Sequence, residues 1–345
     1  MPDRRTIIQG LGALPLALAM SGVPAAARKA RKPLRLRPGD TVGLVEPAAF
    51  SDDPEQIEAV KSTIRAMGLV PLVGRHVGTR HGYLAGNDRQ RAADLDAMFA
   101  NDEVRAVFAV RGGWGSARLL PLLDWKTIRA NPKLLIGFSD ITALHLAFAA
   151  RAGFPTIHAP NAGGSWPEIS WNSLWHLAFA GATPTFRNPA ADAGDPTAQE
   201  RWRTTAIRSG KARGRLLGGN LSVLTALVGT PWLPDFDGAI LFLEDTGEAE
   251  YRIDRMLSQL ALSGILGRVA GVVFGRCTRC TTGGEDYLGF TIPELLQHYF
   301  APLGIPAFYG ANIGHVANQL SLPVGAKVEI DADPGTIRIL EPVVA

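Results

Sequence analysis

Residues 134–141 read Leu-Leu-Ile-Gly-Phe-Ser-Asp-Ile, an apolar run that ends at a glycine and passes directly into a helical pattern over 141–152. A continuous apolar run of this length is typical of a strand buried in a parallel sheet. A strand followed at once by a helix is the repeating unit of an α/β protein, whose ligand sites lie outside the carboxyl ends of the strands. The stretch therefore predicts the fold class and one edge of a functional site.

Strands and helices alternate on both sides of this stretch. Before it, the sequence predicts strands at 41–45, 69–73 and 104–110 and helices at 54–67 and 88–99. After it, the sequence predicts strands at 214–217, 239–243, 269–274 and 307–308, helices at 221–228, 251–262 and 292–300, and an antiparallel strand pair at 327–330 and 336–340. Alternation at this spacing implies a mostly parallel sheet that is covered on both faces.

The pattern predicts two domains. The N-terminal domain, 40–162, is expected to have a parallel sheet of flavodoxin-like or Rossmann-like type, and the smaller C-terminal α/β domain is expected at 211–342. The segment 163–210 loses periodicity, and we predict a surface linker there with one short helix at about 173–180. A cleft between two domains is a favoured place for a small ligand, so the active site is expected there.

Composition narrows the class of protein. The chain has 345 residues, of which 46% are hydrophobic and 19% charged, so it is long and apolar enough for two folded domains. Its formal net charge is only +3 and no basic cluster stands out, so nucleic acid is not an expected partner.

The first 27 residues have the features of a signal peptide of the twin-arginine type. Arg4 and Arg5 precede an apolar stretch, and three alanines at 25–27 offer a cleavage site. A membrane anchor helix is the alternative, but the glycines and the proline within this stretch disfavour it. We therefore expect an exported, periplasmic protein with a linker at 28–39 and no stable membrane association after processing. Cys277 and Cys280 would then form a local disulfide.

Polar residues gather after three of the predicted strands. The run Arg-Gly-Gly-Trp-Gly-Ser at 111–116 is rich in glycine, so its backbone amides can approach an anion closely. The run lacks the glycine and lysine spacing of nucleotide-binding motifs. Ser139 lies at a tight turn from strand to helix, where a serine is either an exposed nucleophile or a helix cap. Glu244 and Asp245 follow the third of these strands, and His315 is one of two histidines in strand-end loops. Spacing alone leaves these roles open.

Taken together, these motifs resemble the LD-carboxypeptidase family of serine peptidases, which includes microcin-immunity hydrolases. The resemblance rests on an ordered set of motifs that runs from about residue 40 to residue 340: Arg-Gly-Gly-Trp-Gly at 111–115, Gly-Phe-Ser-Asp at 137–140, Gly-Gly-Asn-Leu at 218–221, Leu-Glu-Asp at 243–245 and Gly-His at 314–315.

The resemblance implies a catalytic triad of Ser139, His315 and Glu244, with the backbone amides of Gly113 and Asp140 as the oxyanion hole. It implies no metal and no cofactor. A homodimer is an expectation of the same origin. A substrate with a free carboxylate needs a cationic pocket. The candidate substrate-binding residues, chosen because they lie in or near the glycine-rich run, are Arg111, Arg118 and the aromatic residue Trp114.

The expected reaction is hydrolysis of the L,D-amide bond that releases the terminal D-Ala of a murein tetrapeptide. One alternative is hydrolysis of another amide, such as that of a peptide-nucleotide antibiotic, which would give self-immunity. Another is an exported protein that binds a peptide or sugar without cutting it. Trp114 and Glu46 stand where the family usually has Tyr and an Ala-Pro-Ser type sequence, and because both are expected close to the cleft, these departures bear on substrate preference before they bear on the triad. Typical relatives are cytoplasmic, which is the alternative location.

Overall fold

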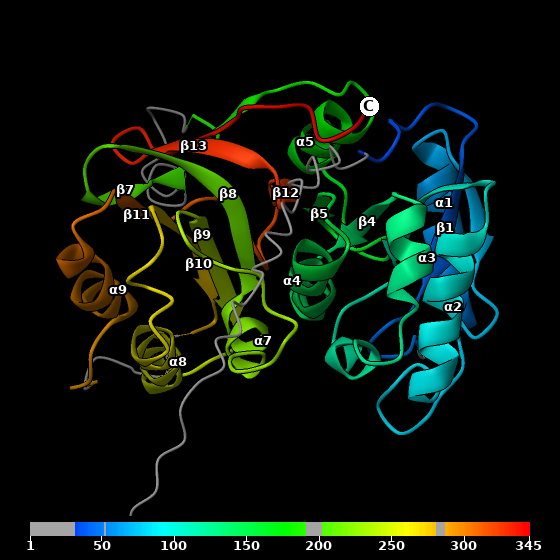
Figure 1. The fold of residues 1–345 in the computed structure, drawn as a ribbon, viewed down its shortest axis with the longest axis horizontal. Coiled ribbons are helices and arrows are strands. Elements are labelled where there is room, and N and C mark those ends of the chain that lie inside the picture. Colours follow the sequence, from blue (N-terminus) through cyan, green and yellow to red (C-terminus); the bar gives the residue numbers. More distant parts are fainter. Residues whose placement is uncertain (1–31, 52, 191–201, 281–286) are drawn as a thin grey trace, which may run out of the picture. The chain divides into compact units, whose positions relative to one another are not determined.

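The computed structural model describes residues 32–51, 53–190, 202–280 and 287–345. The expected signal peptide at 1–27 lies outside the described residues. The described elements form two sheets, one of six strands and one of eight, and the described residues belong to one compact unit (Figure 1). None of the helices in these ranges is long and apolar enough to cross a membrane.

The first sheet is built from consecutive strand–helix units. Its strands, in spatial order, are β12 (Leu322–Val324), β5 (Thr156–His158), β4 (Leu134–Gly137), β3 (Val104–Ala109), β1 (Thr41–Val45) and β2 (Val70–Val73). Strands β1 to β5 are parallel and have the order 2-1-3-4-5 of flavodoxin-like folds. The parallel sheet and its flavodoxin-like type are therefore confirmed. In this order the chain reverses direction across the sheet between β1 and β3, where such folds place ligands.

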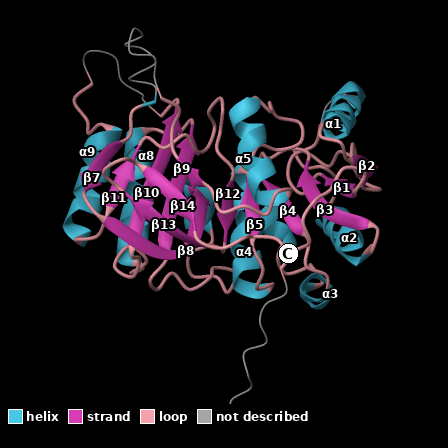
Figure 2. Ribbon diagram, turned by 90° about the horizontal axis from the view of Figure 1, so that it is seen from above, coloured by secondary structure: helices cyan, strands magenta, loops and turns pink. Residues whose placement is uncertain are grey.

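Helices cover both faces of the first sheet (Figure 2). Helices α1 (Pro54–Ala66) and α5 (Glu168–Ala178) lie on one side, and α2 (Asp88–Ala100), α3 (Trp125–Ala130) and α4 (Thr142–Arg151) lie on the other. The helix starts follow from local sequence, because Asp53 caps α1 and Pro54 occupies its first position. The side chains between helices and sheet form a continuous apolar core.

The second sheet combines a parallel centre with antiparallel edges. Its strands, in spatial order, are β6 (Thr185–Phe186), β14 (Thr336–Ile339), β13 (Lys327–Asp331), β8 (Lys211–Asn220), β9 (Ile240–Thr246), β10 (Gly271–Thr278), β11 (Ala307–Tyr309) and β7 (Thr205–Arg208). The four strands β8 to β11 are parallel, and β13 and β14 form the expected antiparallel pair. Helices α7 (Leu221–Ala226), α8 (Glu250–Leu262) and α9 (Ile292–Phe300) connect the parallel strands.

The segment 163–210 contains more regular structure than its sequence indicates. Helix α5 starts earlier than expected, and β6 and β7 from this segment form the two edges of the second sheet. Strand β12 comes from the C-terminal part of the chain but pairs with β5 of the first sheet. These short strands carry little periodicity of their own, and long-range pairing defines them.

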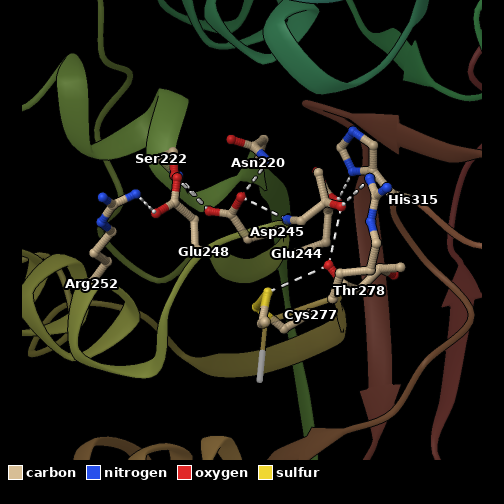
Figure 3. Close-up of a disulfide and its surroundings, with 12 residues drawn as sticks. Asn220, Ser222, Glu244, Asp245, Glu248, Arg252, Cys277, Thr278 and His315 are labelled. Carbon is tan, nitrogen blue, oxygen red and sulfur yellow. Dashed lines mark hydrogen bonds and ion pairs between the residues drawn. A yellow bond between two sulfur atoms is a disulfide. The ribbon is translucent and has the colours of Figure 1, made fainter. Parts of the chain in front are cut away.

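The two sheets are joined through α4 and β12, both of which contact β8. Cys277 and Cys280 form the expected disulfide at the end of β10. Strand β10 pairs with β9 there, so that Cys277 lies opposite Asp245 (Figure 3). The described part of the linker 28–39 is also anchored, because Leu36 is buried and its amide donates to the Ala178 carbonyl.

Candidate active site

Ser139 stands at the carboxyl end of β4 in an unusual backbone conformation. Its φ of 66° lies in the left-handed region, which is rare and costly for a residue with a side chain. It begins a short 3₁₀ turn, η2 (Ser139–Ile141), that leads into α4, and no side-chain hydrogen bond caps either segment. Capping therefore does not account for Ser139, and the sharp turn presents its hydroxyl at the edge of the sheet.

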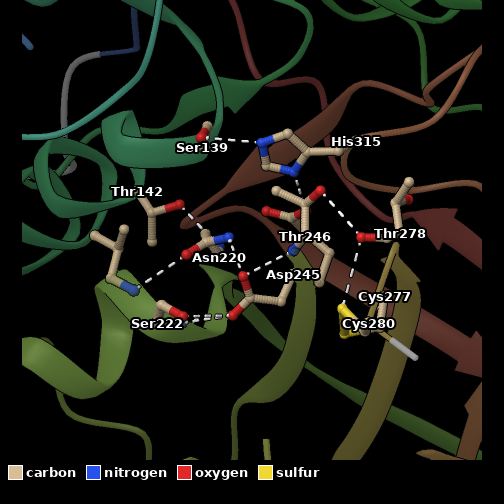
Figure 4. A network of polar contacts seen from close by, with 12 residues as sticks. Ser139, Thr142, Asn220, Ser222, Asp245, Thr246, Cys277, Thr278, Cys280 and His315 are labelled. Atoms are coloured by element: carbon tan, nitrogen blue, oxygen red, sulfur yellow. Dashed lines mark hydrogen bonds and ion pairs between the residues drawn. A yellow bond between two sulfur atoms is a disulfide. The ribbon is translucent and has the colours of Figure 1, made fainter. Parts of the chain in front are cut away.

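The structure brings Ser139, His315 and Glu244 together in one hydrogen-bonded chain. Figure 4 shows Ser139 beside His315, and Figure 3 shows Glu244 beside His315. Ser139 Oγ lies 3.0 Å from His315 Nε2, and His315 Nδ1 lies 2.8 Å from Glu244 Oε2. Because the carboxylate can only accept, Nδ1 carries the proton that it donates to Glu244, and Nε2 is left to accept the serine proton. The three residues are separated by up to 176 positions in sequence, and this arrangement is that of a nucleophile, a base and an orienting acid.

Burial strengthens the interaction between His315 and Glu244. Glu244 lies within β9, is fully buried, and its Oε1 has no hydrogen-bond partner among the described residues. The ring of His315 packs at 4.8 Å, centroid to centroid, against the ring of Phe138, the residue before the nucleophile. The imidazole is thus held from one side by a charge and from another by an aromatic ring.

Gly314 has to be a glycine for this geometry to exist. Its φ is +99°, and a Cβ built on it would lie 2.3 Å from Glu244 Oε2. A side chain there would displace the carboxylate that orients His315. The Gly-His motif therefore combines a close backbone approach with the histidine that contacts both Glu244 and Ser139.

Asp140 ties the glycine-rich run to the nucleophile turn. Its carboxylate accepts from the Ser116 amide at 2.7 Å, and Ser116 Oγ donates back to the Asp140 carbonyl at 2.6 Å. Burial raises the pKa of the Asp140 carboxyl, while hydrogen bonds from Ser116 and Gly115 and the charge of Arg91 oppose that shift. Gly112 packs directly on Ser139, since a Cβ at that glycine would meet Ser139 Cβ at 3.0 Å. The two segments that carry the Gly113 and Asp140 amides are thereby fixed to each other.

Asp245 has a corresponding role on the second sheet (Figure 3). Its carboxylate accepts from Asn220 Nδ2 at 3.0 Å, from Ser222 N and Oγ at 2.9 and 2.8 Å, and from the Thr246 amide at 2.8 Å. Burial raises the pKa of this carboxyl, and the neighbouring charge of Glu244 adds to the rise. The backbone N–H of Asn220 in turn donates to Thr142 Oγ1 at the start of α4. This bond links the two sheets beside the triad.

The three residues proposed from sequence as substrate contacts have different environments. Arg111 lies beside the nucleophile turn, donates one hydrogen bond to the Phe50 carbonyl at 2.7 Å and forms no ion pair with any described residue. Arg118 is paired at 2.8 Å with Asp88, whose carboxylate also pairs with Arg91. Trp114 is 53% exposed and packs edge-on against Tyr83.

Sequence reasoning missed several residues that shape the site. Arg91 is buried on α2 and donates to the carbonyls of Pro47 and Gly115, which holds the glycine-rich run from behind. Its position four residues before the buried Leu95 is a signal, because a charged residue on an apolar stripe needs partners. Asn161 follows β5, and its Oδ1 accepts from the Phe138 amide at 3.1 Å. Strand β5 is too short to draw attention to the residues after it.

Two buried histidines lie under the nucleophile turn. His145 contacts Thr156 Oγ1 and the Gly137 carbonyl, both at 2.8 Å, and burial lowers its pKa to about 4. His158 has no hydrogen-bond partner among the described residues, and burial holds its pKa well below the usual range. Both rings are therefore neutral near pH 7, so neither competes with His315 for the charge of Glu244. Glu46, the other family departure, is buried and accepts from Ser51 Oγ and the Gly78 amide.

The comparisons with known proteins place the chain among carboxypeptidases and their relatives. A murein tetrapeptide carboxypeptidase of Pseudomonas aeruginosa is 33% identical over 85% of this chain and 93% of its own length. A protein of Bacillus subtilis named a probable murein peptide carboxypeptidase is 36% identical over 89% of this chain and 94% of its own length. Among solved structures, the Escherichia coli microcin C7 self-immunity protein MccF, in complex with glutamyl sulfamoyl guanosine, is 26% identical, covers 91% of this chain and 99% of its own, and has a TM-score of 0.81.

Family models match both halves of the chain. Residues 42–159, which contain Ser139, match the model described as the LD-carboxypeptidase N-terminal domain. Residues 213–330, which contain Glu244 and His315, match the LD-carboxypeptidase C-terminal domain. The two models together match most of the described chain, and the protein belongs to the LD-carboxypeptidase family.

Proposed function

We propose that this protein is a serine carboxypeptidase that hydrolyses an L,D-amide bond and releases the terminal D-Ala of a murein tetrapeptide. The observation that carries the proposal is the chain of hydrogen bonds from Ser139 through His315 to Glu244. Its relatives in Bacillus subtilis and Pseudomonas aeruginosa are named for murein peptides, which supports the substrate class. A 3.0 Å contact between serine and histidine argues against a protein that only binds its ligand.

In the proposed mechanism, Ser139 Oγ attacks the carbonyl carbon of the scissile bond while His315 Nε2 takes the hydroxyl proton. The imidazolium is stabilised by the buried Glu244 carboxylate. His315 then gives the proton to the amine of D-Ala as the carbon–nitrogen bond breaks, which leaves an ester between the peptide and Ser139. Water attacks this ester, gives its proton to Nε2, and that proton returns to Ser139 Oγ as the ester bond breaks.

The negative charge of each tetrahedral intermediate falls on the former carbonyl oxygen. We propose that the backbone amides of Gly113 and Asp140 donate to this oxygen. The bonds between Asp140 and Ser116 support this role, because they fix the two amide-bearing segments before substrate arrives. Loss of one such donor typically costs about 10²–10³ in rate.

The test is the release of D-Ala from murein tetrapeptide, followed by mass spectrometry, with the wild-type protein and Ser139→Ala. The variant is expected to lose at least about 10⁴-fold in kcat, because the residues of such a triad act as a unit. Thr142→Ser provides a matched control, since it keeps the hydroxyl that accepts from Asn220 and lies outside the triad. Equal release by wild type and Ser139→Ala would contradict the proposed nucleophile.

A second candidate is hydrolysis of the amide of a peptide-nucleotide conjugate. The similarity to MccF in a complex with a glutamyl sulfamoyl nucleoside favours it. The two candidates differ in the leaving group, which is a single amino acid in one case and a nucleotide derivative in the other. Incubation of the same enzyme with an aminoacyl sulfamoyl nucleoside and with murein tetrapeptide, in parallel, separates them by the ratio of the two kcat/KM values.

We also propose that the mature protein works outside the cytoplasm. The disulfide between Cys277 and Cys280 supports this location, because disulfides persist mainly in oxidising compartments. Cell fractionation of the wild type and of a variant with Arg4→Lys and Arg5→Lys tests it. Periplasmic wild type and cytoplasmic variant protein is the expected result, and wild-type protein that stays in the cytoplasm would contradict the proposal.

A further inference from the structure

A pocket lies beside the nucleophile turn, where the order of the first sheet reverses between β1 and β3. It has a volume of about 540 Å³ and is bounded by α1, by the end of β3 and by the turn after β5. The lining residues that matter here are Ser51, Gln56, Thr63, Arg111, Phe138 and Asn161. Among the described residues that line it, none is acidic.

Two residues that line the pocket are close in sequence to the active site, although Ser139, Glu244 and His315 do not line it. Arg111 precedes Gly112, which packs on Ser139, and Phe138 precedes Ser139 itself. The ring of Phe138 also packs against His315. Phe138 is therefore the residue that both lines the pocket and contacts the histidine proposed to give its proton to the leaving amine.

Asn161 supplies a donor that is still free. The residue is 6% exposed, and its Oδ1 accepts from the Phe138 amide at 3.1 Å. That bond fixes the orientation of the side-chain amide, since only the oxygen can accept from an N–H group. The opposite atom, Nδ2, donates to no described residue and is not fully buried, and Asn161 lines the pocket. An amide whose oxygen is held by the backbone and whose nitrogen is unpaired beside a pocket is placed to donate to a ligand acceptor.

Arg111 supplies the charge. One of its five N–H groups donates to the Phe50 carbonyl, and no carboxylate of the described chain pairs with the guanidinium. The two hydroxyl groups of the pocket are already used as donors, because Ser51 donates to Glu46 and Thr63 donates to the Ala59 carbonyl. Besides the exposed side chain of Gln56, the side-chain donors left for a ligand are the Arg111 guanidinium and the Asn161 amide, a pair that suits a carboxylate.

We propose that Arg111 and Asn161 form the subsite for the free carboxylate of the departing C-terminal residue. The inference rests on the proposed carboxypeptidase function and adds the group that makes the enzyme cut only at a chain end. A peptide that continues beyond this residue, or that ends in an amide, lacks the charge that Arg111 pairs with. Selectivity for a single terminal residue would follow from this charge and not from the size of the pocket.

The test compares two tetrapeptides that differ only at the end, one with D-Ala as free acid and one with D-alaninamide. Wild type is expected to prefer the acid by about 10–100-fold in kcat/KM, as for a charge-assisted hydrogen bond pair. Arg111→Met should reduce this preference to within about 3-fold, mainly by loss on the acid. Asn161→Asp keeps the oxygen that accepts from Phe138 and replaces the free donor by a negative oxygen, so it should also lose activity on the acid selectively.

Arg65→Met is the matched control, because Arg65 is an exposed arginine on α1 outside the pocket lining. It should leave the preference unchanged. A wild type without preference, or an unchanged preference in Arg111→Met, would overturn the subsite while D-Ala release still supported the proposed function. A preference that Arg118→Met abolishes and Arg111→Met does not would overturn it too.

Failure of the proposed function gives a different result. If wild type releases D-Ala from neither peptide, calorimetry on Ser139→Ala measures binding of both. Tighter binding of the acid that Arg111→Met removes would still support the subsite. Equal binding of acid and amide, or no binding, would overturn the subsite together with the function.

Discussion

The two strand ends that meet in the active site, those of β4 and β9, have the same design but are held by different means. Each carries a residue of the triad followed by a buried aspartate, Ser139–Asp140 on the first sheet and Glu244–Asp245 on the second. Each aspartate accepts backbone N–H groups from a neighbouring turn. A triad residue thus gains a rigid neighbour on both sheets.

The difference lies in the backbone. Ser139 has a positive φ, so the turn that presents it is strained and has to be held by the surroundings. Glu244 lies in a regular strand, paired with Asn220 of β8. Its carboxylate keeps its position only because Gly314, which approaches it closely, has no side chain. Strain sets the position of the nucleophile, while packing between distant segments sets the position of the base and its acid. Variants at the two strand ends should therefore fail in different ways.

The largest expected effect is that of Glu244→Gln. The variant keeps the shape of the side chain but loses the charge that stabilises the imidazolium, and it lets His315 adopt the wrong tautomer. By analogy with other serine peptidases, kcat is expected to fall by about 10⁴-fold with little change in KM. Steady-state release of D-Ala measures both constants, and a variant that kept more than a tenth of wild-type kcat would contradict the role of Glu244.

Gly314→Ala tests the close approach on the second sheet. Its Cβ would lie 2.3 Å from Glu244 Oε2, so the carboxylate and His315 have to move. A displacement of this size is expected to cost about 10²-fold in kcat. Gly304→Ala is the control, because its φ is +73° and nothing lies within 4 Å of the new Cβ. Equal kcat losses in the two variants would show that backbone strain, and not contact with Glu244, is responsible.

The paired variants Asp140→Asn and Asp245→Asn compare the two anchors directly. Asp140→Asn replaces one carboxylate oxygen by an NH2 group, which cannot accept from the backbone N–H groups of Ser116 and Gly115. The segments of the proposed oxyanion hole are then held less firmly, so kcat is expected to fall by about 10-fold or more. Asp245→Asn loses part of a network around Asn220 and Ser222, so it should lower stability by about 1–3 kcal/mol and kcat by less than about 3-fold. Steady-state kinetics and urea denaturation of both variants measure these effects. A larger loss of kcat in Asp245→Asn than in Asp140→Asn would contradict the proposed difference between the two anchors.

The sequence predicts what depends on local pattern. The apolar run 134–138, the turn at Ser139 and the carboxylates after 239–243 are visible because periodicity and residue type are local properties. The parallel arrangement of β1 to β4 follows from the same alternation of strands and helices, while the short strand β5 is not among the predicted elements. That His315 and Glu244 belong with Ser139 came from the resemblance to a family, since no spacing rule connects residues so far apart.

Long-range pairing determines the rest. Strands β12 and β6 have two or three residues each, and only their partners in the sheets define them. Asn161 shows the same limit within the site. Its proposed role depends on its hydrogen bond from the Phe138 amide and on its place in the pocket lining, and both are long-range contacts. The bonds that Asp140 makes to Ser116 equally join two turns whose contact no local pattern predicts.

The smallest expected effect concerns the dependence of stability on pH. Burial raises the pKa of the Asp140 and Asp245 carboxyls, so the folded protein binds these protons more tightly than the unfolded chain does. Stability therefore falls as pH rises from about 4, the ordinary carboxyl value, through the raised pKa values. Glu244→Gln removes the charge that adds to the rise at Asp245 only, so the fall should become shallower.

Urea denaturation between about pH 4 and pH 8 measures this slope for wild type, Glu244→Gln, Asp140→Asn and Asp245→Asn. Both aspartate variants should fall less steeply than wild type. In the Asp245→Asn background the added Glu244→Gln change should have little further effect, while in the Asp140→Asn background it should keep its full effect. An equal effect in both backgrounds would mean that Glu244 acts on the stability of the two strand ends alike, and the two anchors would then not be electrostatically independent.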